Sequence, residues 1–565
     1  MKVFNGGIRR ARPGAVAPLV PLALCAASLA VAVPAHAHAD AGTGTGPGSG
    51  GTSRAAAAPR IVGGTPTDRD MTTWMVRVEV VGGSRSFRCS GVLVAANKVL
   101  TSGHCGTEAR NGLGTRVESS NQGWSSVDVR SVWVNPAYSE GAVTDDNDVS
   151  VLTLSTPLVF GNRFLPLPMA RPQDSALYQP GTKAVAYGYG STSADPDTPL
   201  PSDPLGVQLP VNDDATCAAA TDAVNGDPTT YVPGHMLCAG TPGTGDDATG
   251  KTPCRSDEGG ALVAGGRLIG LISPLRDPAS GKTCNYQGTF PLFAKISTYY
   301  AQIQQQLDTT DATEDGKADI LARTPAGASY LYASTGTGYR TRAAAPVRLA
   351  NYDTVIQADL DRDGHQDYIL RAKGTGNVFT AQRPLYPWTG AHLVYTSLAT
   401  GWGSVKALLA PGDVTGDGIT DLLSEDSAGR VRVYAGKPSQ GFNKPFLTGL
   451  NWNRYNKVIG HGDLTGDGFP DALARDARTG DLHLLPGTGE ITTPFGAPVR
   501  ISGGWNGYDK LLTVGDYDGD GHPDLLARVP SGSLYLVRGT GRTGPGTFAA
   551  PVRIGKGWNT YNLLG

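Results

Sequence analysis

The stretch Cys254-Arg255-Ser256-Asp257-Glu258-Gly259-Gly260 places two adjacent carboxylates directly before a pair of glycines. Working outward from it, three further motifs precede it in chain order. They are Arg60-Ile61-Val62-Gly63-Gly64, Leu100-Thr101-Ser102-Gly103-His104-Cys105, and Asp146-Asn147-Asp148 followed by Val149-Ser150-Val151-Leu152-Thr153-Leu154. Each motif sets a charged or proton-transferring side chain beside small or apolar residues, and together the four decide the fold of the first half of the chain.

These motifs resemble those of the trypsin/chymotrypsin family of serine proteases over residues 61 to 307. The resemblance implies a double β-barrel in which His104 stands at the general base. It implies that Asp148 accepts a hydrogen bond from the imidazole of His104 and so fixes its tautomer. It also implies that a cut after Arg60 frees the Ile61 ammonium, which then pairs with a buried Asp257.

Glu258 stands where this family carries its nucleophilic serine. A carboxylate has no hydroxyl to attack a carbonyl, and a carboxylate beside His104 would hold the imidazole protonated. Ser256 is the only hydroxyl nearby, and the resemblance puts it where a glycine N–H helps to form the oxyanion hole, so its amide and not its side chain would face the reacting carbon. We therefore expect the chemistry of peptide hydrolysis to be lost.

The expected substrate pocket departs from the family as well. Thr252 stands where a trypsin-like enzyme has its specificity aspartate, and Ser273-Pro274-Leu275 replaces a Ser-Trp-Gly strand. Leu275 would crowd the mouth of the pocket, and the region of Pro291 is a poor match to a glycine-lined wall. No preference for Lys or Arg substrates is expected.

The N-terminus resembles a secretory signal peptide over residues 1–39, with early basic residues, an apolar stretch and the small-residue signal Ala35-His36-Ala37. A membrane anchor is the alternative, but the apolar stretch contains proline and lacks a stop-transfer flank. The Arg9-Arg10 pair leaves a twin-arginine route open. Residues 40–60, rich in Gly, Ser, Thr and Ala, are typical of a flexible pro-segment.

Six cysteines remain once Cys25 leaves with the apolar stretch, an even number suited to an oxidising compartment. Six cysteines allow 15 pairings. The family resemblance selects Cys89 with Cys105, Cys217 with Cys238, and Cys254 with Cys284.

The second half, residues 308–565, repeats an Asp-rich loop about every 50 residues, a period that suits one four-stranded propeller blade. Oxygen ligands at loop positions 1, 3, 5 and 9, with glycine at position 6, suit a hard cation, and calcium is the expected ion. The alternative is a set of Asp-Gly turns that bind no metal. The expected ligands are Asp311, Thr313, Asp315 and Asp319; Asp359, Asp361, Asp363 and Asp367; Asp413, Thr415, Asp417 and Asp421; Asp463, Thr465, Asp467 and Asp471; and Asp516, Asp518, Asp520 and Asp524.

Each loop leads into a strand, as in Asp524–Arg528, followed by a turn and a second strand, as in Ser533–Val537. The units resemble FG-GAP/VCBS repeats of integrin-type propellers. Five units predict five blades, although integrin-type rings have seven. Aromatic segments such as Trp452-Asn453-Arg454-Tyr455 are expected in the blade core, with a sugar-binding platform as the alternative.

The whole chain is predicted to be all-β, since 77 glycines and 40 prolines separate short Val, Leu and Tyr runs. With 48 basic and 50 acidic residues it carries no field that would attract nucleic acid or an anionic membrane. We expect a secreted, extracellular serine protease homologue, catalytically inactive, that binds or adheres to an extracellular protein or glycan through its two halves. The alternative is an active secreted endopeptidase with an atypical site.

Overall fold

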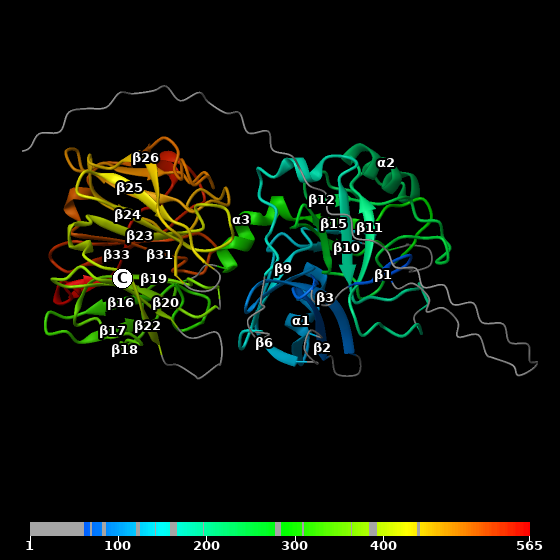
Figure 1. Ribbon diagram of the computed structural model, residues 1–565, viewed down its shortest axis with the longest axis horizontal. Coiled ribbons are helices and arrows are strands. Elements are labelled where there is room, and N and C mark those ends of the chain that lie inside the picture. The colour runs from blue at the N-terminus through cyan, green and yellow to red at the C-terminus, as the bar shows by residue number, and fades with distance from the viewer. Residues whose placement is uncertain are drawn as a thin grey trace, which may run out of the picture. The chain divides into compact units, whose positions relative to one another are not determined.

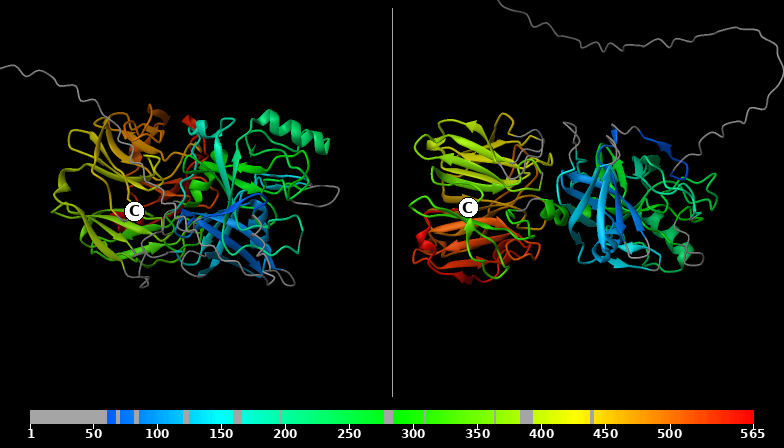
Figure 2. Two further views of the ribbon diagram at one scale, coloured as in Figure 1. Left: turned by 45° about the vertical axis from the view of Figure 1, so that its right-hand side comes forward. Right: turned by 90° about the horizontal axis from the view of Figure 1, so that it is seen from below.

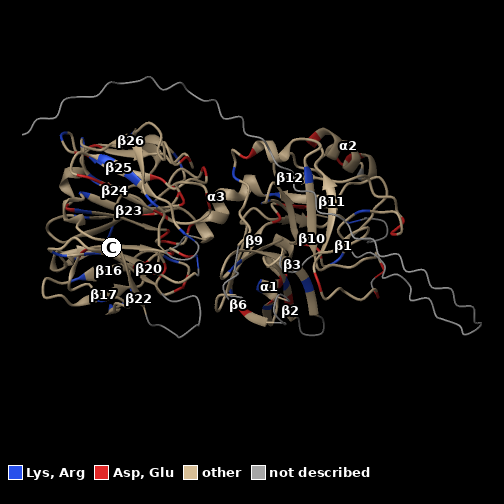
Figure 3. Cartoon of the chain, in the orientation of Figure 1, with Lys and Arg blue, Asp and Glu red and all other residues tan. Residues whose placement is uncertain are grey.

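The computed structural model describes most of the chain from Ile61 onward, and the predicted signal peptide and pro-segment lie outside the described residues. Among the helices it describes, none combines the length and apolar character needed to cross a membrane. Basic and acidic residues are interspersed over both halves (Figure 3). The described residues are 61–67, 71–81, 86–119, 125–141, 143–158, 166–195, 197–276, 284–307, 310–362, 364–382, 393–437 and 441–565.

The first half begins with a closed barrel of six strands in the order β2-β3-β4-β9-β6-β5 (Figure 1). Its strands alternate between core and solvent: in β2, Val78 and Val80 are buried, while Arg77 before Val78 and Glu79 between the two valines are half-buried. The bounds are β2 Met75–Val81, β3 Ser86–Ala95, β4 Lys98–Thr101, β5 Gly114–Ser119, β6 Ser125–Val134 and β9 Ser150–Leu154. Two short strands, β7 Ser139–Glu140 and β8 Asp145–Asp146, form a separate two-stranded sheet.

A second sheet of seven strands follows in the order β1-β11-β10-β13-β14-β15-β12. An antiparallel bridge between Val211 and Ala239, directly after β11 and β12, closes this sheet on itself. The predicted double barrel is therefore present. The bounds are β1 Thr65–Pro66, β10 Lys183–Gly188, β11 Leu205–Pro210, β12 Met236–Cys238, β13 Ala261–Ala264, β14 Arg267–Ser273 and β15 Leu292–Lys295.

Three α-helices accompany the barrels: α1 Gly103–Asn111, α2 Asp214–Asn225 and α3 Ile296–Leu307. Helix α3 buries one stripe: Ile296, Tyr299, Tyr300, Ile303 and Leu307. A short 3₁₀ segment, Ser175–Tyr178, lies between the two barrels in sequence.

The second half forms five four-stranded antiparallel sheets, which are the blades of a propeller (Figures 1 and 2). The strands predicted at Asp524–Arg528 and Ser533–Val537 correspond to β32 and β33. The bounds are β16 Ile320–Arg323, β17 Ser329–Tyr332, β18 Ala343–Ala344, β19 Tyr352–Ala358, β20 Asp367–Ala372, β21 Val378–Gln382, β22 Val394–Ala399, β23 Ala407–Gly412, β24 Asp421–Glu425, β25 Arg430–Tyr434, β26 Phe446–Asn451, β27 Tyr455–Ile459, β28 Ala472–Asp476, β29 Leu482–Leu485, β30 Val499–Ser502, β31 Lys510–Gly515, β32 Asp524–Arg528, β33 Leu534–Val537, β34 Val552–Gly555 and β35 Leu563–Leu564.

The ring closes through the last strand of the chain. β35 pairs with β16 through Leu563 opposite Arg323 and Leu564 opposite Ala322, so it supplies the innermost strand of the first blade. The label C in Figure 1 marks this end of the chain beside β16. Five blades, as the repeat count predicts, complete the ring.

The aromatic segments that precede the innermost strands belong to the blade core. Trp452, Trp505 and Trp558 are 2%, 6% and 2% exposed, which leaves no face for a sugar. Two of them begin the short 3₁₀ segments Trp505–Gly507 and Trp558–Thr560, and similar segments lie at Trp402–Ser404 and Gly544–Gly546. The core prediction is confirmed.

Neighbouring blades are joined by a buried arginine in the second strand of a blade. Arg528 donates from Nη1 to the carbonyls of Trp558 and Tyr561, at 2.9 and 2.7 Å, and from Nε to Asp509. Arg475 makes the same pair of bonds to the carbonyls of Trp505 and Tyr508. Each guanidinium therefore satisfies carbonyls at the entry of the next innermost strand.

We predict that Arg528→Met destabilises the propeller by about 2–4 kcal/mol, because it leaves two buried carbonyls and Asp509 without their donor. The measurement is the free energy of unfolding from urea denaturation of the propeller transition. Arg430→Met is the matched control, since Arg430 is 56% exposed beside Asp426 and its loss should cost no more than about 1 kcal/mol. Equal losses in the two variants would contradict the role of Arg528.

Candidate functional site

Asp148 is a buried carboxylate held by two donors from different elements. It is 1% exposed and accepts from the backbone N of His104 at 2.9 Å and from the Ser273 hydroxyl at 2.6 Å. His104 is in the first turn of α1, whose N-cap Ser102 accepts from the amide of Cys105, and Ser273 ends β14. Burial, helped by the charge of Asp145, raises the pKa of Asp148 to about 7.

The imidazole of His104 packs edge-on against Phe87, with ring centroids 5.3 Å apart, and within the described residues it forms no hydrogen bond. The hydrogen bond expected between the imidazole and Asp148 is thus not formed in this structure. The carboxylate of Asp148 still has lone pairs to accept it, beyond the bonds from the His104 amide and the Ser273 hydroxyl. The predicted contact between His104 and Glu258 is likewise not formed in this structure. No carboxylate fixes the tautomer that a general base requires.

The loop that carries Glu258 is held rigidly by its backbone. The Glu258 carbonyl accepts from the Ser90 amide, and the Ser256 carbonyl accepts from the Ser90 hydroxyl at 3.0 Å. A Cβ at Gly259 would lie 2.0 Å from Thr101 Oγ1, so only glycine fits there. Ser256 has a φ of +71°, a conformation that costs a non-glycine residue energy and that the surrounding bonds maintain.

Glu258 is 8% exposed, so its carboxyl group lies inside the protein. Burial raises its pKa to about 7, and the backbone amides of Glu258 and Ser256 oppose this rise. By the family resemblance these are the two amides expected to stabilise an oxyanion. In this chain they face a carboxyl group that the protein itself supplies.

Asp257 is fully buried and is satisfied by backbone donors. It accepts from the amides of Gly190 and Cys254 at 2.6 and 2.8 Å, and burial raises its pKa to about 8. Ile61 is also fully buried, among apolar side chains of the second barrel such as Ala184 and Val207. The ion pair of Ile61 with Asp257 requires a cut after Arg60 and stays a prediction.

The expected substrate pocket is a cavity of about 30 Å³, which is room for about one water molecule. Thr252, Glu258, Ser273 and Leu275 line it, whereas Ser256 does not. Phe290, 8% exposed, lines the same cavity and was missed by the sequence reading, although the neighbouring Pro291 already marked that wall as atypical. Among the described residues this cavity is small for the side chain of a peptide substrate.

Three disulfides brace this half of the chain: Cys89–Cys105, Cys217–Cys238 and Cys254–Cys284. They are the pairs implied by the family resemblance. The first joins β3 to the helix that carries His104, and the third anchors the loop of Glu258.

The Asp-rich loops of the propeller share one hydrogen-bond pattern. The first aspartate accepts from amides inside its own loop, as Asp413 does from Gly416 and Gly418. The last accepts from the loop and from the residue after the third strand, as Asp421 does from Thr415 and Gly436. The threonines at position 3 donate to the first aspartate, as Thr465 does to Asp463 at 3.1 Å. Each loop is thereby folded around its carboxylates.

Three of the five loops gather carboxylates closely enough to share a cation. Their oxygens lie within 4.8 Å of one another in the triads Asp359, Asp361 and Asp367; Asp413, Asp417 and Asp421; and Asp516, Asp518 and Asp524. Asp363 lies outside the described residues. Asp520 does not join its triad, and the loops of Asp311, Asp315, Asp319 and of Asp463, Asp467, Asp471 form no such group among the described residues.

The electrostatics of these loops fit a hard cation. Burial and the neighbouring Asp518 and Asp516 raise the pKa of Asp524 to about 8. Burial and Asp413 raise that of Asp421 well above its ordinary value. Crowded carboxylates whose charges repel are the donor set that calcium takes in proteins, so the residues present fit that ion.

The first half is a double barrel with a loop like the nucleophile loop of serine proteases, and the second half is a five-bladed propeller. The first half therefore has the fold of a serine protease. Residues 61–303 match the Trypsin family, and residues 463–527 and 511–548 match an FG-GAP-like repeat and an FG-GAP repeat. The chain is 34% identical over 226 residues to a protein named trypsin from Saccharopolyspora erythraea, covering 39% of this chain and 87% of that one. The chain belongs to the trypsin family.

One further curated relative gives the same assignment. Human kallikrein-14 is 31% identical over 220 residues, which cover 38% of this chain and 73% of kallikrein-14. Among solved structures, mouse neuropsin, described as a serine protease, aligns with 22% identity and a TM-score of 0.34 over 43% of this chain and 98% of neuropsin.

We predict that Glu258→Gln stabilises the protein at about pH 8 by up to about 3 kcal/mol and changes little at about pH 4. The folded-state pKa of Glu258 is raised from 4.5 to about 7, so the ionisation of this group costs stability progressively as the pH rises through that window, and the full cost persists above it. The measurement is the unfolding free energy against pH. Glu108→Gln, an exposed change on α1, should show no such pH dependence.

Proposed function

We propose that this protein is a catalytically inactive member of the trypsin family that acts outside the cell as a binding or adhesion protein. The observation that carries the proposal is Glu258: an acid replaces the nucleophile and lies buried at the amides of Ser256 and Glu258. A carboxyl group there can neither form an acyl-enzyme nor leave room for an oxyanion.

Two further features support inactivity. The imidazole of His104 has no carboxylate partner in the described chain, so no carboxylate orients the ring to act as a general base. The described pocket of about 30 Å³ is small for a substrate side chain. Loss of nucleophile, base orientation and pocket together leave a rigid, disulfide-braced scaffold whose surface is available for binding.

Secretion is part of the same proposal. The structure contains three disulfides, and disulfides persist in oxidising compartments. The N-terminal residues resemble a signal peptide. The partner is proposed to be an extracellular protein or glycan.

The competing function is an active endopeptidase, which the curated trypsin relatives and the retained Asp148 and Asp257 favour. A fluorophosphonate probe separates the two, because it labels an activated nucleophile. We expect no labelling of the mature chain, with a trypsin-family enzyme as positive control. Stoichiometric labelling of any residue would show that the chain is an active hydrolase.

We predict that Glu258→Ser alone restores little turnover, at least about 10³-fold below an active trypsin-family enzyme, because the pocket stays closed and His104 stays unpaired. The measurement is kcat/KM on a panel of peptide substrates. Glu108→Ser, on the exposed side of α1, is the control for background hydrolysis. Activity within tenfold of a trypsin-family enzyme would mean that the pocket opens readily.

Calcium in the propeller loops is proposed as the stabilising ion, supported by the three carboxylate triads. We predict that chelation lowers the melting temperature of residues 308–565 by several degrees, since an ion at a hundred times its Kd contributes about 2.7 kcal/mol. Differential scanning calorimetry with and without calcium is the measurement. Asp524→Asn should remove part of the calcium effect, and Asp481→Asn, outside the loops, should not. An unchanged melting temperature under chelation would count against metal.

A further inference from the structure

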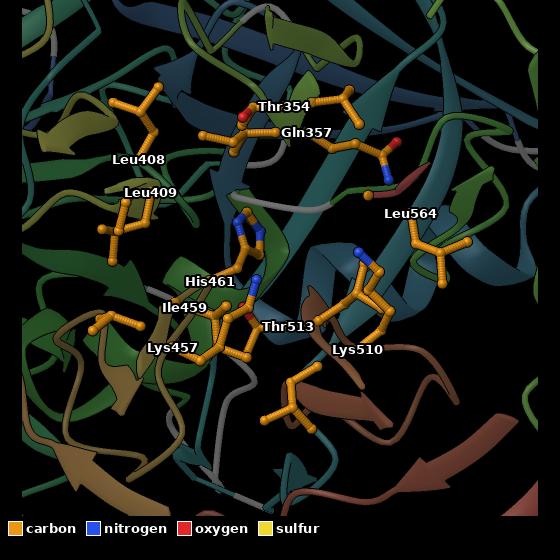
Figure 4. Close-up of a pocket in the computed structure, with 18 of the residues that line it drawn as sticks. Thr354, Gln357, Leu408, Leu409, Lys457, Ile459, His461, Lys510, Thr513 and Leu564 are labelled. Carbon is orange, nitrogen blue, oxygen red and sulfur yellow. The ribbon is translucent and has the colours of Figure 1, made fainter. Parts of the chain in front are cut away.

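A cavity of about 590 Å³ occupies the centre of the propeller, lined by the innermost strands of the blades (Figure 4). Its volume lies in the range of small-molecule sites, and apolar residues such as Leu408, Leu409 and Ile459 form part of its wall. This cavity is separate from the Asp-rich loops and lies entirely within the second half of the chain.

Three lysines enter the cavity from neighbouring innermost strands. Lys406 directly precedes β23, Lys457 is the third residue of β27, and Lys510 is the first residue of β31. Because the strands of successive blades run in the same sense around the ring, the three residues lie toward the same end of the cavity. Figure 4 shows Lys457 and Lys510 among the side chains that line the cavity.

The acids of the lining are already paired with other cations. Asp353 accepts from Arg371 Nε at 2.8 Å, and Glu425 lies 3.7 Å from the Lys406 ammonium, which also donates to Asn453 at 2.9 Å. Asp353 and Glu425 are the acidic side chains among the described lining residues. Neither is left to neutralise Lys457 or Lys510.

Lys457 and Lys510 form no ion pair and no side-chain hydrogen bond within the described chain. Enclosure by the surrounding blades lowers the pKa of Lys457 to about 8, with further lowering by Lys510 and Arg475. Enclosure and Arg528 also lower the pKa of Lys510, while Asp509 opposes this. Two cations are thus held close enough to repel each other at the wall of a solvent-accessible cavity.

Comparison of the blades shows where the acid that balances the arginine of the second strand is missing. In the second blade Tyr352 is followed by Asp353, and in the fifth blade Tyr508 is followed by Asp509. Each of these aspartates pairs with the arginine of its own blade. In the first and fourth blades the residue after the corresponding tyrosine is Asn562 and Asn456, which accept from Arg323 and Arg475 but bring no charge. Lys457 therefore directly follows Asn456, a position that holds no acid to balance the charge of Arg475.

We propose that the propeller cavity binds a small organic anion, a carboxylate or phosphate monoester with an apolar body, whose acidic group lies between Lys457 and Lys510. Ammonium groups bind phosphate and carboxylate as point charges, and a bound anion would replace the repulsion between these two cations by attraction. The apolar wall takes the remainder of the ligand. This proposal does not depend on whether the trypsin-like half is active.

Calorimetric titration of the full chain with phenyl phosphate tests the proposal, with phenol as the neutral probe of the same body. We expect saturable one-site binding of phenyl phosphate and at least tenfold weaker binding of phenol, since each charge-assisted hydrogen bond is worth about one to two powers of ten in affinity. Absence of saturable phenyl phosphate binding would overturn the proposal, as would equal binding of phenol.

Lys457→Gln and Lys510→Gln should each weaken phenyl phosphate binding by at least about tenfold. Lys406→Gln is the matched control: it removes the same charge from the same cavity, but one already paired with Glu425, and should change the affinity less than about threefold. Equal losses in all three variants would show that the general field of the cavity, and not this pair, holds the anion, and would overturn the proposed site.

A second readout guards against variants that misfold. Phenyl phosphate should raise the melting temperature of the wild-type propeller and not that of the Lys457→Gln/Lys510→Gln double variant. Without ligand, the double variant should melt no lower than wild type, because the two ammonium groups repel each other. A double variant that is still stabilised by phenyl phosphate would place the anion elsewhere.

Discussion

Burial of carboxylates is the constraint on which both halves of this chain depend. A buried carboxylate is tolerated only where amides, hydroxyls or a cation take the place of water. In the barrels, Asp148 and Asp257 tie loops from distant parts of the sequence together through such donors. In the propeller, the aspartate that begins each second strand is buried the same way, and it connects its loop to the end of the third strand. The same buried carboxylates therefore connect the loops of the fold and form the candidate sites.

The constraint also explains what Glu258 does to the site it occupies. The loop keeps the backbone bonds of a nucleophile loop, with Ser90 and Gly259 holding it on both sides. An anion-binding arrangement of amides that would act on a passing intermediate instead faces a permanent acid. The disulfides and the buried aspartates around the loop are retained, although Glu258 brings no hydroxyl with which to form an acyl-enzyme.

Much of the fold could be predicted from the sequence because its signals are local. The motifs around His104, Asp148 and Asp257 fix positions along the chain, and the Asp-rich loops give the period of a blade, so the double barrel, the disulfide pairs and the five blades followed. The orientation of the His104 ring did not follow, because it depends on Phe87 across the barrel. Phe290 was missed for the same reason: which residue fills a pocket is decided by packing between strands distant in sequence.

The cavity lysines escaped the sequence reading because they are visible only as departures from a repeat whose geometry is known. In every blade but the third an arginine of the second strand bonds carbonyls at the start of the next blade. In the second and fifth blades an acid, Asp353 or Asp509, balances its charge. The third blade has Glu425 at the arginine position and pairs it with Lys406, whereas the first and fourth keep the arginine but have Asn562 and Asn456 in place of the acid. Stability alone would favour an arginine balanced by an acid in every blade. The third blade reaches charge balance with the pair of Glu425 and Lys406 instead. The first and fourth blades lack this balance, and of these two the fourth adds a lysine to the cavity wall, Lys457, whose charge acts on Lys510 of the fifth. A repeat protein gains a ligand site most simply in this way, by unbalancing one unit while its neighbours maintain the ring.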